Sequence, residues 1–217
     1  MTLDLSIYLV TDSSQAQRCG RSVVRTVQEA VAGGVTTVQV REKHAEGREV
    51  LNLVEALVGR LPAHVTVLIN DRIDIYQVAK ARGVRVGGVH VGQRDLPVEE
   101  VRALVGAEAV IGLTANTPED LAAAQTSPAR VDYVGIGVVR ETASKDDAPA
   151  VIGVAGVARL AGGCSLPAVA IGGIVPTDLA SLRSAGLAGA AVMSWVCASD
   201  DPRRSASELR QAWQVAA

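Results

Sequence analysis

The sequence predicts an α/β fold, a single (β/α)8 TIM barrel that occupies residues 1–217. Three observations lead to this prediction. Short apolar runs rich in β-branched residues recur along the whole chain, amphipathic stretches separate them, and polar residues and glycines follow nearly every run. The runs are almost continuously apolar, as expected for parallel strands that are buried on both faces. About eight such strand–helix units in one rhythm are typical of this barrel.

The expected elements follow one another in regular order along the chain. The strand candidates are apolar runs bounded by polar or glycine residues, at residues 7–11, 37–41, 66–69, 88–91, 110–114, 133–138, 168–171 and 190–194. Amphipathic helix candidates lie between them, for example at residues 21–32, 48–61, 98–105, 118–125 and 202–215. Pro118 and Pro176 suit the first turns of helices, where the missing N–H of proline removes no hydrogen bond.

A doubly wound open sheet is the alternative architecture, since it uses the same alternation of strands and helices. In a barrel the polar residues after the strands converge on one face, whereas an open sheet spreads them along an edge. Their presence after nearly every strand favours the barrel. The chain shows no linker, low-complexity segment or change in composition, so we expect no second domain.

Composition excludes several classes of partner. There is no Phe, and aromatic residues make up only 2% of the chain, which argues against a stacking surface for nucleic acid. The net charge is −2 without long charge runs, and no apolar run approaches the ~18 residues needed to span a bilayer. The three cysteines are far apart and form no metal-ligand pair or disulfide framework. We expect a cytoplasmic domain of the size of an enzyme, without a nucleic-acid or membrane surface; the sequence leaves open whether it forms a homo-oligomer.

Charged residues follow several of the predicted strands. Arg41 and Lys43 follow the second strand, Asp71 the third, Asp95 the fourth, and Lys145 lies in the polar loop after the sixth. Taken singly, each could be an ordinary surface charge. Together they would bring three cations and two carboxylates to one mouth of the barrel. This set suits a Mg²⁺–diphosphate, because Mg²⁺ prefers one or two carboxylates with phosphate oxygens and water.

The last two predicted strands suggest a phosphate site. Gly172 and Gly173 would let the backbone approach an anion closely, and the Ser194 hydroxyl could donate a hydrogen bond to it. A tight turn alone would also explain the two glycines. His90 lies in an apolar strand and is expected to be a satisfied interior histidine, not a base or metal ligand. Ser194 has no triad partner in an evident pattern, so it is not expected to be a nucleophile.

These residues, in this order, resemble the thiamine-phosphate synthase family over nearly the whole chain. The most specific motifs are residues 38–43 (VQVREK), 69–72 (INDR) and 88–97 (GVHVGQRDLP). Residues 132–137, the loop that ends at residue 149, and residues 170–174 (AIGGI) add to the resemblance. One such motif would be weak evidence, whereas all of them in register are strong evidence.

The resemblance implies a role for each candidate. The pyrimidine pyrophosphate would be bound by Gln39, Arg41, Lys43, Asn70, Thr114 and Lys145. Mg²⁺ would be held by Asp71 and Asp95, and the thiazole phosphate by Thr142, Ser144, Gly173, Met193 and Ser194. Mg²⁺ and the cations Arg41, Lys43 and Lys145 would stabilise pyrophosphate as it leaves. The thiazole nitrogen would then attack the methylene cation of the pyrimidine.

The chain departs from the family pattern mainly in one loop. The family usually has Gly-Pro-Val-Phe-x-Thr-x-Thr-Lys where this chain has GVVRETASK at residues 137–145, so a proline and an aromatic residue are replaced. The loop hydroxyls and lysine are kept, and we expect a loose lid that becomes ordered on pyrophosphate. Trp195 stands where the family usually has a small residue.

Two other functions compete with synthase activity. A sister group isomerises a thiazole carboxylate phosphate or acts in regulation, and its members tend to lose the metal-binding Asp and use a histidine after the fifth strand. This chain keeps Asp71 and Asp95 and has Asn116 near that histidine position. A non-catalytic phosphate sensor would keep the Gly172, Gly173 and Ser194 cup but would have no use for the two carboxylates. The residues favour the synthase.

Overall fold

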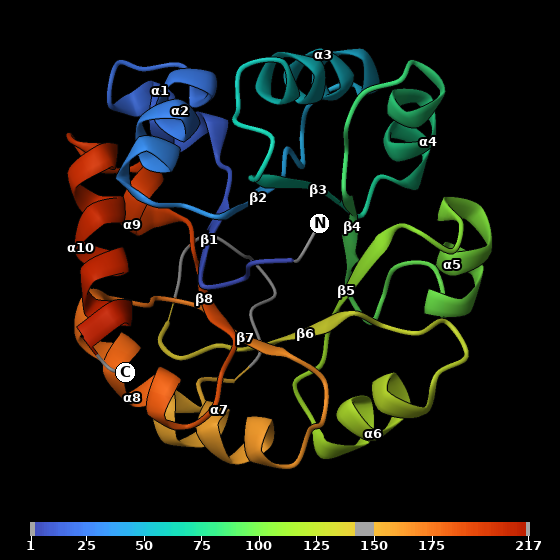
Figure 1. The fold of residues 1–217 in the computed structure, drawn as a ribbon, viewed down its shortest axis with the longest axis vertical. Coiled ribbons are helices and arrows are strands. Elements are labelled where there is room, and N and C mark those ends of the chain that lie inside the picture. Colours follow the sequence, from blue (N-terminus) through green and yellow to red (C-terminus); the bar gives the residue numbers. More distant parts are fainter. Residues whose placement is uncertain (1–2, 142–149, 216–217) are drawn as a thin grey trace.

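The computed structural model describes residues 3–141 and 150–215. Its eight parallel strands form a closed barrel in which each strand pairs with the next along the chain and β1 pairs with β8 (Figure 1). The strands are β1 Ile7–Val10, β2 Thr37–Val40, β3 Thr66–Asn70, β4 Gly88–Val91, β5 Val110–Thr114, β6 Tyr133–Gly137, β7 Ala168–Ile171 and β8 Gly189–Val192. The predicted TIM barrel is confirmed.

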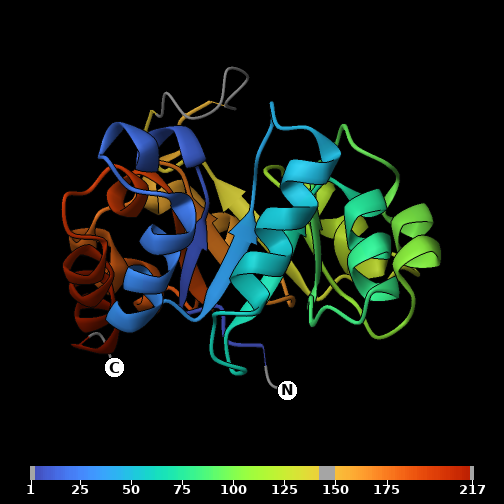
Figure 2. The ribbon, with the colours of Figure 1, turned by 90° about the horizontal axis from the view of Figure 1, so that it is seen from above.

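Helices surround the ring of strands and flank it on both sides in the perpendicular view (Figure 1, Figure 2). Their bounds are α1 Ser13–Arg18, α2 Val23–Gly33, α3 Gly47–Val58, α4 Ile73–Ala81, α5 Val98–Val105, α6 Pro118–Thr126, α7 Gly153–Gly162, α8 Leu179–Ser184, α9 Ser194–Cys197 and α10 Pro202–Val215, with the 3-10 helix η1 at Pro176–Asp178. No helix within the two described ranges is long and apolar enough to cross a membrane.

The predicted strand boundaries agree with the structure to within two residues, and the largest difference is at the end of the eighth strand. It ends at Val192, and Ser194 instead begins the short helix α9. The N–H of Cys197 donates to the carbonyl of Met193 at 2.8 Å, so the chain is already helical there. The predicted first turns are confirmed, since Pro118 begins α6 and Pro176 begins η1.

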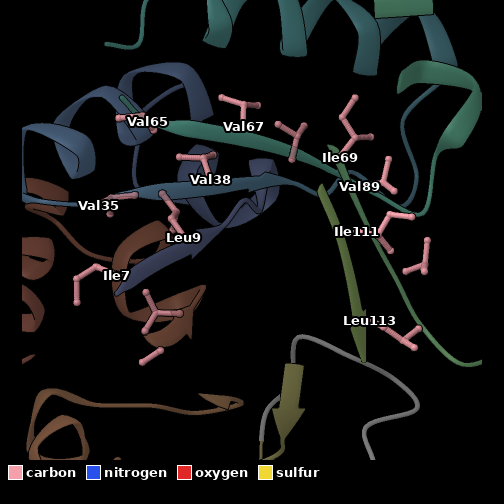
Figure 3. Packing of buried hydrophobic residues seen from close by; sticks show 14 of the residues in the cluster. Ile7, Leu9, Val35, Val38, Val65, Val67, Ile69, Val89, Ile111 and Leu113 are labelled. Atoms are coloured by element: carbon pink, nitrogen blue, oxygen red, sulfur yellow. The ribbon is translucent and has the colours of Figure 1, made fainter. Parts of the chain in front are cut away.

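Side chains alternate between two cores along each strand. The outer core packs strands against helices and includes Ile7, Leu9, Val38, Val67, Ile69, Val89 and Ile111 (Figure 3). A separate interior cluster contains Leu5, Tyr8, Val10, Leu68, Tyr133, Val169 and Ala191. Because successive strand residues point to opposite faces, the inward set includes a few polar residues as well. The barrel therefore holds polar groups inside an otherwise aliphatic wall.

Candidate active site

The carboxyl end of β2 carries two of the predicted substrate-binding residues. Gln39 is only 5% exposed, and its Nε2 donates to the Tyr8 hydroxyl at 2.7 Å. Arg41 follows directly, and its backbone N–H donates to Thr11 Oγ1 at 2.9 Å. Thr11 lies at the end of β1 and is fully buried. The contact fixes the main chain of Arg41 against the neighbouring strand end, whereas Lys43 is exposed beyond it.

Glu42 joins the loops after β1 and β2. Its Oε1 accepts from Ser13 Oγ at 2.7 Å and from Thr11 Oγ1 at 3.3 Å. Burial raises the pKa of Glu42, and the two hydroxyl donors only partly offset that effect. The sequence pattern does not single out Glu42, Thr11 or Ser13. Together they hold the segment that presents Arg41 and Lys43.

The predicted metal-binding carboxylates lie at the ends of β3 and β4. Asn70 ends β3, and its Nδ2 donates to Asp71 Oδ2 at 2.6 Å. Asp71 has a left-handed backbone with φ of 58°, which only a minority of non-glycine residues adopt. Asp95 lies in the loop after β4, where its Oδ2 accepts the Gly92 N–H at 2.7 Å. Each carboxylate is held by a local donor.

Electrostatics link these carboxylates to each other and to Arg41. The pKa of Asp71 is raised to about 6, first because the side chain is partly buried and then because of the charge of Asp95 and a hydrogen bond with it. Asn70 and the charge of Arg41 act in the opposite direction. Three residues predicted from separate strands therefore lie within interaction range. Their proximity agrees with the sequence pattern, and their roles in metal and substrate binding stay predictions.

His90 faces the barrel interior and has partners on both ring nitrogens. Its Nδ1 lies 2.9 Å from the Tyr133 hydroxyl and its Nε2 lies 3.1 Å from Thr114 Oγ1. The prediction of a satisfied interior histidine is confirmed. Thr114 ends β5, and its carbonyl accepts from Gln93 Nε2 at 2.7 Å. The predicted pyrophosphate-binding hydroxyl thus contacts the histidine directly.

The segment after β6 is held by the loop after β7. Arg140 forms a two-pronged ion pair with Asp178, at 2.5 Å and 2.7 Å, and its Nη1 also donates to the Gly173 carbonyl at 3.1 Å. Burial opposes ionisation of Asp178, but donors from Arg140 and Val175 outweigh it and lower the pKa of the carboxyl. In the motif that the sequence resembles, this position is usually aromatic, whereas this chain has the ion-paired Arg140. The predicted residues Thr142, Ser144 and Lys145 lie outside the described residues.

The predicted phosphate end comprises the turn after β7 and the start of α9. Gly172 and Gly173 have φ of 96° and 64°, a conformation that favours glycine. A Cβ on Gly172 would lie 2.5 Å from the Val138 Cβ, so the turn also needs the space. Gly173 and Ser194 are exposed, and half-buried Met193 precedes Ser194. The tight turn is shown, and phosphate binding there stays a prediction.

The fold and these contacts define a class of protein. All eight strands are parallel, so the carboxyl ends of β2, β3, β5 and the loops after β4, β6, β7 and β8 share one face of the barrel. Enzymes with this fold build their active sites on that face. The arrangement of charged residues, hydroxyls and a glycine turn there is that of a TIM-barrel enzyme.

Comparisons with known proteins identify the family. Residues 7–196 match the family described as Thiamine monophosphate synthase. The chain is 42% identical to the thiamine-phosphate synthase of Azorhizobium caulinodans, an alignment that covers 95% of this chain and 94% of the relative. It is also 42% identical to that of Syntrophomonas wolfei, with 97% of each chain covered. A solved thiamine phosphate pyrophosphorylase from Pyrococcus furiosus superposes with a TM-score of 0.83 at 29% identity, covering 99% of this chain and 98% of that one. The chain therefore belongs to the thiamine-phosphate synthase family, and it is a transferase of thiamine biosynthesis.

Sequence reasoning missed the two interior tyrosines beside the site. The hydroxyls of Tyr8 and Tyr133 lie 2.7 Å apart, although the residues are 125 positions apart in the chain. Successive residues of a strand point to opposite faces, so Tyr8 could have been placed inside the barrel once its neighbour Leu9 was assigned to the outer core. Which residue it contacts depends on the closure of the barrel, and no local pattern gives that.

Proposed function

We propose that this chain condenses 4-amino-2-methyl-5-(diphosphooxymethyl)pyrimidine with 4-methyl-5-(2-phosphooxyethyl)thiazole, with Mg²⁺ as cofactor, and releases pyrophosphate. The observation that supports the proposal best is the proximity of Asp71, Asp95 and Arg41 at the ends of neighbouring strands. A divalent cation between two carboxylates, beside a guanidinium, is suited to a diphosphate leaving group. Relatives named for the same activity support the choice of substrates.

The donor set fits Mg²⁺. Asp71 and Asp95 offer two carboxylates, the number that Mg²⁺ commonly takes from a protein when phosphate oxygens and water supply the rest. Within residues 3–141 and 150–215 there is no group of three or more His, Cys, Asp or Glu side chains that could form a metal centre by themselves. A metal held by these two residues would thus depend on the diphosphate for further ligands.

Residues at the ends of β2, β3 and β5 would bind the pyrimidine pyrophosphate and help its diphosphate to leave. When bound, Mg²⁺ would offset the negative charge that grows on the diphosphate as its C–O bond breaks. Arg41 and Lys43 would bind the same oxygens, and Lys145 would join them, so that the leaving group departs with its electron pair stabilised. Gln39, Asn70 and Thr114 would hold the pyrimidine and its diphosphate in place.

The thiazole half falls to the ends of β7 and β8. Gly173 would offer backbone N–H and Ser194 its hydroxyl to the thiazole phosphate, with Met193 beside them and Thr142 and Ser144 from the loop after β6. Held this way, the thiazole nitrogen would face the methylene carbon and form the new C–N bond. The chemistry needs no protein nucleophile, because the electron-rich aminopyrimidine itself stabilises the cation. The protein contributes position and exclusion of water.

The partners of the enzyme would be the two small-molecule substrates, and we expect neither nucleic acid nor a membrane surface among them. Residues 1–217 would act as one barrel domain in the cytoplasm.

Substitution of the carboxylates tests the metal assignment. Asp71→Asn and Asp95→Asn should each lower kcat by at least about tenfold at limiting Mg²⁺, since loss of about 1.4 kcal/mol of transition-state stabilisation already lowers a rate tenfold. Asp74→Asn is the matched control, because Asp74 lies three residues away on α4 and pairs with Arg72 in solvent. Full activity of both test variants at limiting Mg²⁺ would remove the metal assignment.

A further inference from the structure

A continuous chain of hydrogen bonds crosses the barrel interior beneath the site. It begins at Gln39 on β2, passes through Tyr8 on β1, Tyr133 on β6 and His90 on β4, and ends at Thr114 on β5. The four heavy-atom distances are 2.7, 2.7, 2.9 and 3.1 Å in that order. Its two ends are residues proposed above to bind the pyrimidine substrate. Five different strands contribute one residue each.

The interior is shaped to hold this chain. A Cβ on Gly112 would lie 2.1 Å from Tyr133 Cζ and 2.5 Å from His90 Nδ1. A Cβ on Gly135 would lie 3.3 Å from His90 Cε1. Neither glycine has the positive φ that would explain it through the backbone. The missing side chains therefore provide the room in which the tyrosine and histidine rings meet.

The chemistry of the links gives the chain a direction. The Gln39 amide nitrogen can only donate, so the Tyr8 oxygen accepts from it. Tyr8 is 1% exposed, and its single hydrogen must go to Tyr133 if it is not to be buried without an acceptor. The Tyr133 oxygen accepts that bond, and its own hydrogen goes to His90 Nδ1. Nδ1 then carries no proton of its own, so the histidine proton lies on Nε2.

The bond between His90 and Thr114 determines how the Thr114 hydroxyl is used at the site. With a proton on Nε2, His90 donates to Thr114 Oγ1. The Thr114 hydrogen then does not point at His90, so the hydroxyl can donate it to a second acceptor. Both tyrosines stay un-ionised, because burial raises the pKa of each phenol well above its usual value. The chain thus orients donors without itself releasing a proton.

We propose that Tyr8 and Tyr133 are positioning residues, which hold His90 in the Nε2-protonated tautomer and so aim the Thr114 hydroxyl as a donor at the departing pyrophosphate. This inference rests on the proposed function for the role of Thr114. The tautomer of His90 is independent of any substrate. The two parts can therefore fail separately.

Nitrogen NMR of the substrate-free enzyme tests the tautomer. The chain has only three histidines, and the other two, His44 and His64, are exposed, so His44→Gln and His64→Gln assign the His90 signals. We expect Nε2 to show the shift of a protonated ring nitrogen and Nδ1 that of an unprotonated one. Tyr133→Phe should abolish this preference for the Nε2-protonated tautomer. Tyr76 is a buried tyrosine on α4 that takes no part in the hydrogen-bond series, so Tyr76→Phe should leave the preference unchanged. A proton on Nδ1 in the unaltered enzyme would mean that the chain runs the opposite way, and would overturn the proposal.

Kinetics test the positioning role. Tyr133→Phe should lower kcat by about tenfold, the upper range for loss of one neutral hydrogen bond, and change the KM for thiazole phosphate little. If the tyrosine acts through Thr114, its effect should largely disappear when Tyr133→Phe is made in a Thr114→Val background, because the two changes then break one pathway. Equal effects of Tyr133→Phe with and without the Thr114 hydroxyl would refute the pathway. A defect of the same size in Tyr76→Phe would show general loss of packing instead. An enzyme that makes no thiamine phosphate, but shows the expected tautomer, would refute the proposed function alone.

Discussion

Gly112→Ala should be among the most damaging single-methyl changes in this barrel. The added Cβ would lie 2.1 Å from Tyr133 Cζ, 2.3 Å from its hydroxyl and 2.5 Å from His90 Nδ1. Ordinary van der Waals contact is nearer ~3.5–4 Å, so each of these atoms would have to move by about an ångström or more. Neither ring can yield freely, because Tyr133 is fully buried and both rings are tied by hydrogen bonds.

The size of the effect follows from two contributions. Overpacking of a filled core costs typically about 1–3 kcal/mol. Separation of the His90–Tyr133 hydrogen bond adds about 0.5–1.5 kcal/mol. The sum is about 1.5–4.5 kcal/mol, which for a domain of this size corresponds to a fall in Tm of roughly 3–18 °C.

Thermal and urea unfolding measure this prediction. Gly162→Ala is the control, because Gly162 ends α7, is exposed, and has nothing within 4 Å of the position of an added Cβ. That variant should be as stable as the starting protein or slightly more so, since alanine is the better helix residue. A Gly112→Ala protein with unchanged Tm and an unchanged His90 tautomer would show that the interior is not packed as described.

Three further predictions concern the rest of the site. The folded pKa of Asp178 is lowered, so its ion pair with Arg140 should contribute full stability above the pKa of an unfolded carboxyl, near ~4. This contribution should be lost as the pH falls through the lower folded pKa. Asp178→Asn should therefore flatten the acid limb of the curve of unfolding free energy against pH, and an unchanged limb would contradict the assignment. Ser194→Ala should chiefly raise the KM for thiazole phosphate and Arg41→Ala that for the pyrimidine pyrophosphate; an effect of both on the same substrate in steady-state kinetics would refute the division of the site. Lys145→Ala should lower kcat more than it raises KM, because the lysine is proposed to stabilise charge on the leaving group, and a normal kcat would remove that role.

The fold is predictable because a barrel depends on regular local patterns. The β-branched runs around Val38, Ile69 and Ile111 are buried on both faces of the sheet, so the composition of each run is enough to predict a strand. Parallel pairing in chain order then brings every strand end to one face. For the same reason, the sequence alone places Asp71 and Asp95 together, since each lies in the segment that follows a strand.

The missed features depend on contacts between distant segments. Tyr8 meets Tyr133 only because the barrel closes, and Glu42 meets Ser13 only because the loops after β1 and β2 fold over one another. The apolar neighbours of Ser194 favour a strand, yet the hydrogen bonds of α9 begin at Met193. No local pattern reveals the role of Arg140 either, since its partner Asp178 belongs to a different loop.

Incubation of the purified protein with both substrates and Mg²⁺ tests the central claim most directly. Thiamine phosphate is followed by the fluorescence of its oxidised form, and pyrophosphate is measured in the same sample. We predict that the two products appear in equal amounts, that omission of either substrate abolishes both, and that chelation of Mg²⁺ suppresses the reaction until the metal is restored. Absence of thiamine phosphate in the complete mixture, or formation that is unaffected by chelation, would contradict the account.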